Sequence, residues 1–77
     1  MDEDTIFELY RYKGKPFRIV KKDEKYCNRI VIWYEKYIIT GFLPFDKKNL
    51  RNVKKFLKYI KRFRTKKEIL HDDTIKI

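Results

Sequence analysis

The sequence contains no serine, alanine or glutamine, and only one cysteine, two glycines and two prolines among its 77 residues. Without serine, a Ser-His-Asp catalytic triad cannot form. A single cysteine cannot make an internal disulfide, so the chain is not a disulfide-stapled secreted scaffold and we expect a reducing, intracellular location. No apolar run approaches the roughly 20 residues of a membrane-spanning helix. The acidic N-terminus does not resemble a secretory signal peptide.

The scarcity of glycine and proline is matched by an abundance of hydrophobic residues, which make up 43% of the chain, including 17% aromatic residues. This composition predicts an ordered domain, although 42% of the residues are charged. We expect one domain over residues 1–70 and a flexible tail over residues 71–77. A fold of this size buries only about 60% of the surface that its unfolded chain exposes, so self-association would support it.

The positive charge is concentrated in one stretch of the chain. Residues 46–67 hold 11 basic side chains and 1 acidic one, whereas residues 1–45 hold 9 basic and 7 acidic, and residues 68–77 hold 1 basic and 3 acidic. This single segment therefore accounts for the whole formal net charge of +10. Such a block of like charges indicates a polyanionic partner that offsets the repulsion when it binds.

The first half of the chain is rich in β-branched and aromatic residues, which favour strands. A glycine in the middle of residues 13–15 predicts a turn between the first two strands. The expected strands are residues 5–12, residues 16 to 20 or 22, residues 29–34 and residues 37–43. As an alternative to the last two strands, residues 29–43 form a single bent strand.

The clearest helical pattern lies further along the chain. Asp46 predicts an N-cap for a helix that begins at Lys47 and ends near Arg64 or Thr65. The predicted fold class is α+β, with a small antiparallel β-meander of three or four strands followed by one long basic amphipathic C-terminal helix. The apolar stripe of this helix is assigned to the core or to dimer packing. Its members, at spacings of three and four, are Leu50, Val53, Phe56, Leu57, Ile60 and Phe63.

Candidate catalytic and metal-binding residues are few. Cys27 and His71 could serve as nucleophile and base only if the end of the chain folded back, and we assign Cys27 to a buried or loop position. His71 and residues 72–73, both aspartates, have the composition of a metal site but are assigned to a solvated tail. The sequence has no Gly-rich phosphate loop and no Cys-x-x-Cys pair. We therefore predict a non-enzyme without catalytic residues, metal or cofactor.

Many lysines and arginines interleaved with aromatic residues are typical of proteins that bind nucleic acids, because cations meet phosphates and aromatic rings stack on bases. We therefore predict nucleic-acid binding, with DNA favoured over RNA and a role in transcription or genome maintenance. The alternatives are a small protein that docks on an acidic protein surface by charge and a membrane-surface helix over residues 47–64. The predicted nucleic-acid-binding residues are Lys13, Lys15, Arg18, Lys21, Arg29, Trp33, Lys54, Lys55, Lys58 and Arg62.

Two stretches resemble the single-stranded-DNA-binding domain of the transcriptional positive cofactor four family. Residues 12–17 (Tyr-Lys-Gly-Lys-Pro-Phe) are similar to its first hairpin turn, and residues 40–43 (Thr-Gly-Phe-Leu) with the following helix resemble its last strand and helix. The Asp-Ile-Arg type segment after the hairpin and the Gly- and Lys-rich loop before the last strand are missing. The resemblance implies a homodimer packed through helix 47–64. It also implies that single strands contact the aromatic residues of the β-region together with Lys13, Lys15 and Arg18.

Overall fold

The computed structural model describes residues 2–71, and its longest element is helix α2 (Glu24–Thr40). The helix begins at Asp23, whose side chain accepts a hydrogen bond from the backbone N–H of Tyr26 at 3.0 Å. It ends at Gly41, whose φ of 78° is left-handed and whose N–H donates to the carbonyl of Tyr37 at 2.8 Å. An Asp N-cap and a left-handed glycine are common at the two ends of helices.

Helix α3 (Leu50–Tyr59) follows a single 3-10 turn, η3 (Lys47–Asn49). After α3, Lys61 adopts a left-handed φ of 60°, and the N–H of Arg62 donates to the carbonyl of Leu57 at 2.9 Å. The N–H of Lys61 also donates to the carbonyl of Lys58 at 3.1 Å. These two bonds form a Schellman motif, which satisfies the last carbonyls of the helix and turns the chain away from its axis.

The N-terminal segment consists of short elements. The 3-10 turns η1 (Asp2–Asp4) and η2 (Tyr10–Tyr12) precede helix α1 (Phe17–Val20). The predicted turn at residues 13–15 is confirmed, with Gly14 at a φ of 89° and the N–H of Lys15 bonded to the carbonyl of Tyr12 at 3.0 Å.

The last described element is α4 (Lys66–Leu70). A capping box of Thr65 and Glu68 stabilises the start of this helix. The hydroxyl of Thr65 accepts the N–H of Glu68 at 3.3 Å, and the Glu68 carboxylate accepts the N–H of Thr65 at 3.2 Å. The Thr65 hydroxyl also donates to the Glu68 carboxylate at 2.9 Å, and the two bonds that this carboxylate accepts from Thr65 hold the pKa of Glu68 below its ordinary value. Between α3 and α4, Arg64 pairs with Glu35 of α2 at 2.7 Å, so this connection is tied to α2.

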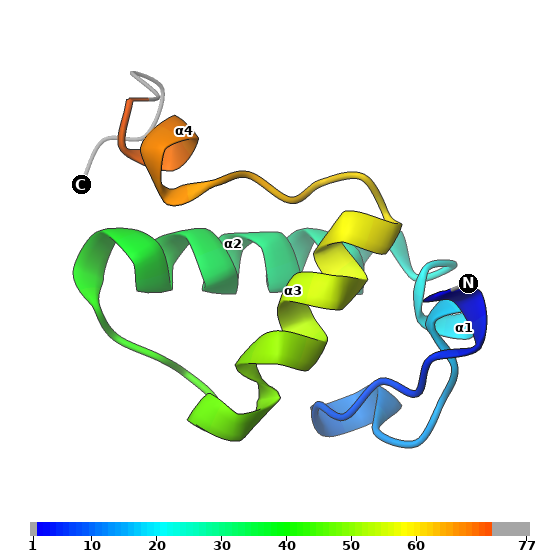
Figure 1. Cartoon of the computed structure of the whole chain (residues 1–77). Helices are drawn as coiled ribbons and strands as arrows, with labels where there is room; N and C mark the ends of the chain where they lie inside the picture. Colours follow the sequence, from blue (N-terminus) through cyan, green and yellow to red (C-terminus); the bar gives the residue numbers. More distant parts are fainter. Residues whose placement is uncertain (1, 72–77) are drawn as a thin grey trace.

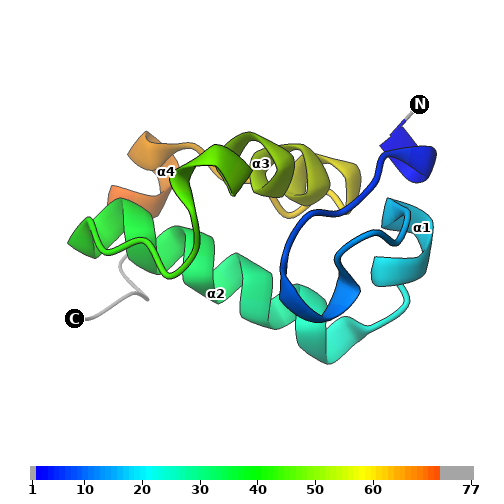
Figure 2. The same ribbon diagram turned by 90° about the horizontal axis from the view of Figure 1, so that it is seen from below.

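The arrangement is visible in two views (Figures 1 and 2). Helices α3 and α4 both pack against α2, and η1 packs against α1 and α3. The core lies between these elements and is rich in aromatic rings, with Phe7 and Phe56 fully buried at a ring-centroid distance of 5.1 Å. The other residues of this buried core are Leu9, Phe17, Val20, Tyr26, Cys27, Ile30, Tyr34, Phe45, Val53, Leu57 and Ile69.

The predicted α+β fold is wrong. Residues 2–71 are mainly helical and contain no β-sheet, and their sole β-type pairing is an isolated bridge between Ile6 and Pro16. The segment predicted as strands 29–34 and 37–43 is instead most of α2 and the loop after it. Its β-branched and aromatic residues suggested strands, but Tyr26, Ile30 and Tyr34 recur at helical spacing and bury one face of α2. This burial outweighs the small difference in intrinsic propensity.

The other two predicted strands are also absent. Residues 5–12 form an extended stretch and η2, and the segment from Pro16 to Lys22 holds α1 followed by a turn. The predicted helix over residues 47–64 exists in a shorter form, because the Schellman motif at Lys61 ends it early. Asp46 precedes the 3-10 turn without a side-chain capping bond.

No helix within residues 2–71 has the length and apolarity needed to cross a membrane. The predicted tail over residues 71–77 lies outside the described residues, except for His71, which follows α4 in a turn.

Candidate nucleic-acid interface

Helix α3 presents four basic side chains on the face opposite its core contacts. Its buried residues are Asn52, Val53, Phe56 and Leu57. A rotation of 100° per residue places the remaining positions 51, 54, 55 and 58 together on the far side of the helix, in a row about 10 Å long. We call this surface the α3 cation face, and its members are Arg51, Lys54, Lys55 and Lys58.

The α3 cation face is free of carboxylates. None of its four members forms an ion pair with an acidic side chain of residues 2–71. Lys58 lies over the ring of Phe63, with 5.1 Å between its Nζ and the ring centroid, and this contact leaves the ammonium charge uncompensated. The predicted candidates Lys54, Lys55 and Lys58 are thus brought together, and they are available to an anion.

A surface hollow of about 470 Å³ lies at the start of α3. Four basic residues and one apolar residue line it, and no acidic residue does. Lys48 is 4.0 Å from the carboxylate of Asp46, but both side chains are more than 70% exposed, so the pairing is weak. The hollow extends the α3 cation face toward η3. Its lining residues are Lys47, Lys48, Leu50, Arg51 and Lys54.

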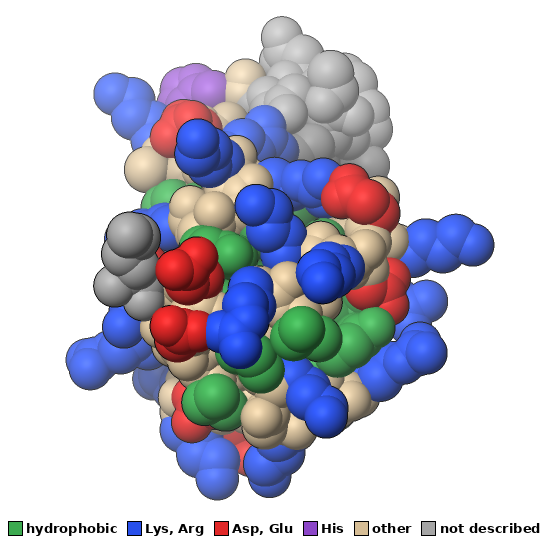
Figure 3. All heavy atoms as spheres, turned by 90° about the vertical axis from the view of Figure 1, so that its right-hand side faces the viewer, with side chains coloured by type: hydrophobic (Ala, Val, Ile, Leu, Met, Phe, Trp, Pro, Cys, Tyr) green, Lys and Arg blue, Asp and Glu red, His purple; other side chains and the backbone are tan. Residues whose placement is uncertain are grey.

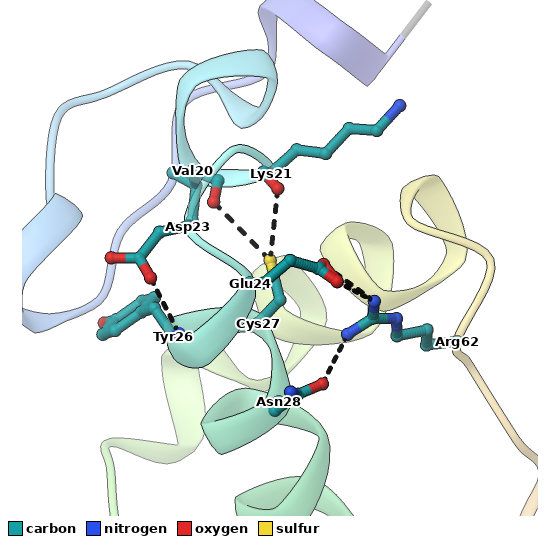
Figure 4. Close-up of polar contacts among 8 residues, drawn as sticks. All are labelled: Val20, Lys21, Asp23, Glu24, Tyr26, Cys27, Asn28 and Arg62. Atoms are coloured by element: carbon teal, nitrogen blue, oxygen red, sulfur yellow. Dashed lines mark hydrogen bonds and ion pairs between the residues drawn. The ribbon is translucent and has the colours of Figure 1, made fainter.

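Arg62, a predicted phosphate ligand, is instead engaged within the chain (Figure 4). Its guanidinium donates to both carboxylate oxygens of Glu24 at 2.6 and 2.9 Å and to the side chain of Asn28 at 2.7 Å. A bidentate pair of this kind is directional and among the stronger ion pairs. Arg62 therefore anchors the end of α3 to the first turns of α2 and does not belong to the α3 cation face.

The other predicted basic candidates on the N-terminal segment and α1 lie outside the α3 cation face. Lys13 and Lys15 occupy the turn after η2, and both are exposed. Arg18 on α1 pairs with Asp4, and Lys21 lies over the ring of Tyr59 with 5.4 Å to the centroid. Figure 3 shows the side of the molecule with α1 and the N-terminus, where basic side chains are mixed with acidic and apolar ones.

Arg29 and Trp33 were also predicted to bind nucleic acid, and both lie on α2. Arg29 is exposed and lines a hollow of about 210 Å³ to which Asp23 contributes a carboxylate. Trp33 is half-buried, and its ring makes edge contacts with Tyr10 and Tyr26 at centroid distances of 5.6 and 6.4 Å. Burial raises the pKa of Tyr26 to about 12.

Three residues of the site were not predicted. Lys47, Lys48 and Arg51 join Lys54 around the basic hollow. The sequence signal for Arg51 was the helical register of residues 50–59, since positions 51, 54, 55 and 58 share one face. The position of residues 47–48 depends on the 3-10 turn before α3, for which the sequence carries no clear signal.

Cys27 lies in the core beneath α1 (Figure 4). Its Sγ donates to the carbonyls of Val20 and Lys21 at 3.5 and 3.7 Å, and burial raises the pKa of the thiol. A buried thiol held in this way has little thiolate character. Within residues 2–71, no three His, Cys, Asp or Glu side chains gather as metal ligands would. The aspartates of the His71 motif lie outside the described residues.

Comparisons with protein-family models, with curated proteins and with solved structures gave no match to this chain. The fold implied by the resemblance to the positive cofactor family is incompatible with the helical structure of residues 2–71. The dimer that this resemblance implied stays a prediction. The apolar stripe on which it depended, from Leu50 to Phe63, packs within the core of the chain itself.

Proposed function

We propose that this protein is a non-catalytic nucleic-acid-binding protein whose α3 cation face contacts the phosphate backbone. The observation that carries the proposal is the absence of any acidic side chain on this face, which the basic hollow of Lys47 and Lys48 continues. Each phosphate of a nucleic acid carries a negative charge, and the release of its condensed counterions drives the binding of lysine and arginine.

The electrostatic repulsion among the cations of the α3 cation face in the free protein supports this interpretation. Arg51 with Lys54, Arg51 with Lys55, Lys54 with Lys58, and Lys55 with Lys58 are neighbours at i,i+3 or i,i+4. Like-charge neighbours of this kind destabilise a helix by about 0.2–0.5 kcal/mol each, so the four pairs cost about 1–2 kcal/mol. Bound phosphates would remove this repulsion. A polyanion therefore binds with a gain that a neutral partner would not provide.

The experiment is fluorescence anisotropy with labelled single-stranded DNA, duplex DNA and RNA of equal length, at about 50 and 200 mM salt. The test variant is Lys55→Gln/Lys58→Gln. Its matched control is Lys22→Gln/Lys36→Gln, which removes the same charge from exposed positions outside α3. We expect the test variant to bind all three probes more weakly. The slope of log K against log salt should fall by about 2 for duplex DNA and by about 1.4 for single strands, since each phosphate contact contributes about 0.9 and about 0.7 respectively.

Each outcome bears on the proposal. Absence of binding by the unaltered protein at low salt would refute nucleic-acid binding altogether. A slope that falls equally in the test and control variants would mean that only the total charge matters, and the α3 cation face would lose its assigned role. Because the substitutions relieve repulsion on α3, we expect the melting temperature of the test variant to be equal to or higher than that of the unaltered protein.

A further inference from the structure

A second hollow, of about 530 Å³, lies beside the α3 cation face. Its lining residues belong to the N-terminal segment, to the loop after α2 and to the turn before α3. The ribbon views show these segments close to the start of α3 (Figures 1 and 2). Leu43, Pro44 and the ring of Tyr10 contribute apolar surface. The charged groups are those of Glu8, Asp46 and Lys13. Its size lies within the range of small-molecule sites.

This hollow is continuous with the basic one. An intervening hollow of about 340 Å³ shares four residues with it, namely Glu8, Lys13, Asp46 and Asn49. The intervening hollow also includes Lys48, which lines the basic hollow at the start of α3. One surface path therefore runs from the aromatic ring of Tyr10 to Arg51, so a single extended ligand can occupy both ends.

Tyr10 is held in position and yet open to solvent. Its hydroxyl donates to the carbonyl of Pro44, and its ring makes an edge contact with Trp33 at 5.6 Å between centroids. Its φ of 45° is left-handed, which is uncommon for a residue that is not glycine and often marks a functional position. In spite of these contacts 54% of the residue is exposed. An ordered, exposed ring of this kind is a stacking surface for a planar ligand.

Asp46, whose carboxylate is 4.0 Å from Lys48, also lines the hollow, so the lining carboxylate without an ion pair within the described residues is that of Glu8. Its backbone N–H is fixed by the side chain of Asn52 at 3.0 Å, and its carboxylate is exposed without an ion-pair partner among residues 2–71. A carboxylate repels phosphate, but it accepts hydrogen bonds from the amino group of a base such as cytosine. The polar end of the hollow is thus suited to a base edge, and the lysines beyond it are suited to the backbone.

We propose that this hollow holds one unpaired nucleobase with an amino group, stacked on Tyr10 and hydrogen-bonded to Glu8, while phosphates of the same strand lie on the α3 cation face. This inference rests on the proposed function and specifies its substrate as a single strand or an unpaired nucleotide. A base inside a duplex is stacked on both faces and paired along its Watson–Crick edge, so it cannot enter. Cytosine-containing strands bind more tightly than uracil-containing ones, since uracil has a carbonyl where cytosine has its amino group.

The test compares oligodeoxycytidylate, oligodeoxyuridylate and a duplex of equal length by anisotropy. Base stacking on an aromatic residue contributes about 1–3 kcal/mol, so Tyr10→Leu should weaken binding of both single strands about fivefold or more and leave duplex binding unchanged. Tyr10→Phe keeps the ring and serves as the matched control, with single-strand binding retained. Glu8→Gln should reduce the preference for cytidine over uridine, because an amide can donate to the uracil carbonyl. Circular dichroism of each variant verifies that it is folded.

Trp33 supplies an independent readout, because it is the one tryptophan of the chain and contacts Tyr10. Oligodeoxycytidylate should change its fluorescence, and inorganic polyphosphate, which has charge but no base, should not. An unaltered protein that binds no nucleic acid would overturn the proposed function. Binding of single strands that Tyr10→Leu and Glu8→Gln leave unchanged would overturn this inference alone.

Discussion

Asn52 is the one polar residue that is buried within residues 2–71, and its replacement tests how the N-terminal segment is attached. Its side-chain oxygen accepts the N–H of Glu8 at 3.0 Å, and its side-chain nitrogen donates to the carbonyl of Ile6 at 2.9 Å. Asn52→Ala removes both bonds and leaves two part-buried backbone groups without partners. Each lost bond costs about 0.5–1.5 kcal/mol, and more where the remaining group stays unsatisfied.

We therefore expect Asn52→Ala to lower the free energy of unfolding by about 2–4 kcal/mol. A chain of this length is stable by about 4–12 kcal/mol, from 0.05–0.15 kcal/mol per residue, so the loss is large enough to measure. The assay is urea unfolding followed by far-ultraviolet circular dichroism. Asn49→Ala is the matched control, since the side chain of Asn49 makes no capping bond at the start of α3. Equal, small losses in the two variants would refute the bridging role of Asn52.

Two further predictions concern the ends of α2. Gly41→Ala should destabilise the protein by about 1 kcal/mol, because a φ of 78° strains alanine although its Cβ meets no atom within 4 Å, and Gly41→Asn should cost less. A Gly41→Ala variant that melts at a higher temperature than the unaltered protein would contradict a left-handed end. Hydrogen bonds from the Tyr12 hydroxyl at 2.6 Å and the Tyr26 N–H hold the pKa of Asp23 below its ordinary value of 3.8. A lowered pKa in the folded state stabilises the fold above the ordinary pKa and ceases to do so as pH falls through the folded pKa. Asp23→Asn keeps a capping oxygen but removes the charge, so its deficit in urea unfolding should be present at neutral pH and shrink well below pH 4. A deficit that is the same at both pH values would exclude the charge of Asp23 as its cause.

The sequence predicted the amphipathic part of α3 because its apolar and basic residues alternate with a clear helical period. Val53, Phe56 and Leu57 are buried as that period requires, and Lys54, Lys55 and Lys58 lie together on the other side. The end of the helix was not predictable in the same way. A Schellman motif usually has glycine at its left-handed position, and here that position is a lysine inside a run of basic residues.

The sequence contains residues that indicate the two ends of α2, but the strand propensity of the residues between them outweighed this indication. Asp23 and Gly41 are good helix-end residues, and they enclose 17 residues without proline. Isoleucine, valine and aromatic residues between them favoured a strand by local propensity. The deciding factor is nonlocal, because Ile30 and Tyr34 are buried by elements that lie far away in sequence. The hollow beside Tyr10 could not be predicted for the same reason, since it joins Tyr10 to Leu43 and Pro44, which lie more than 30 positions away in the sequence.

The basic side chains of residues 46–67 include two groups with different surroundings: the cations on α3 have no acidic partner among residues 2–71, and two arginines after α3 are paired with carboxylates. Beyond α3, Arg62 and Arg64 form bidentate pairs with Glu24 and Glu35, and both acidic partners are on α2. An acidic residue on α3 itself, one turn away from a lysine, would form the i,i+4 pairs that stabilise isolated helices. It would also compete with any phosphate for the same cation. The acids that hold the fold together are thus placed on the neighbouring helix, and α3 keeps its cations unpaired at the cost of its own local stability. This distribution of charge supports the proposal that the α3 cation face binds a polyanion.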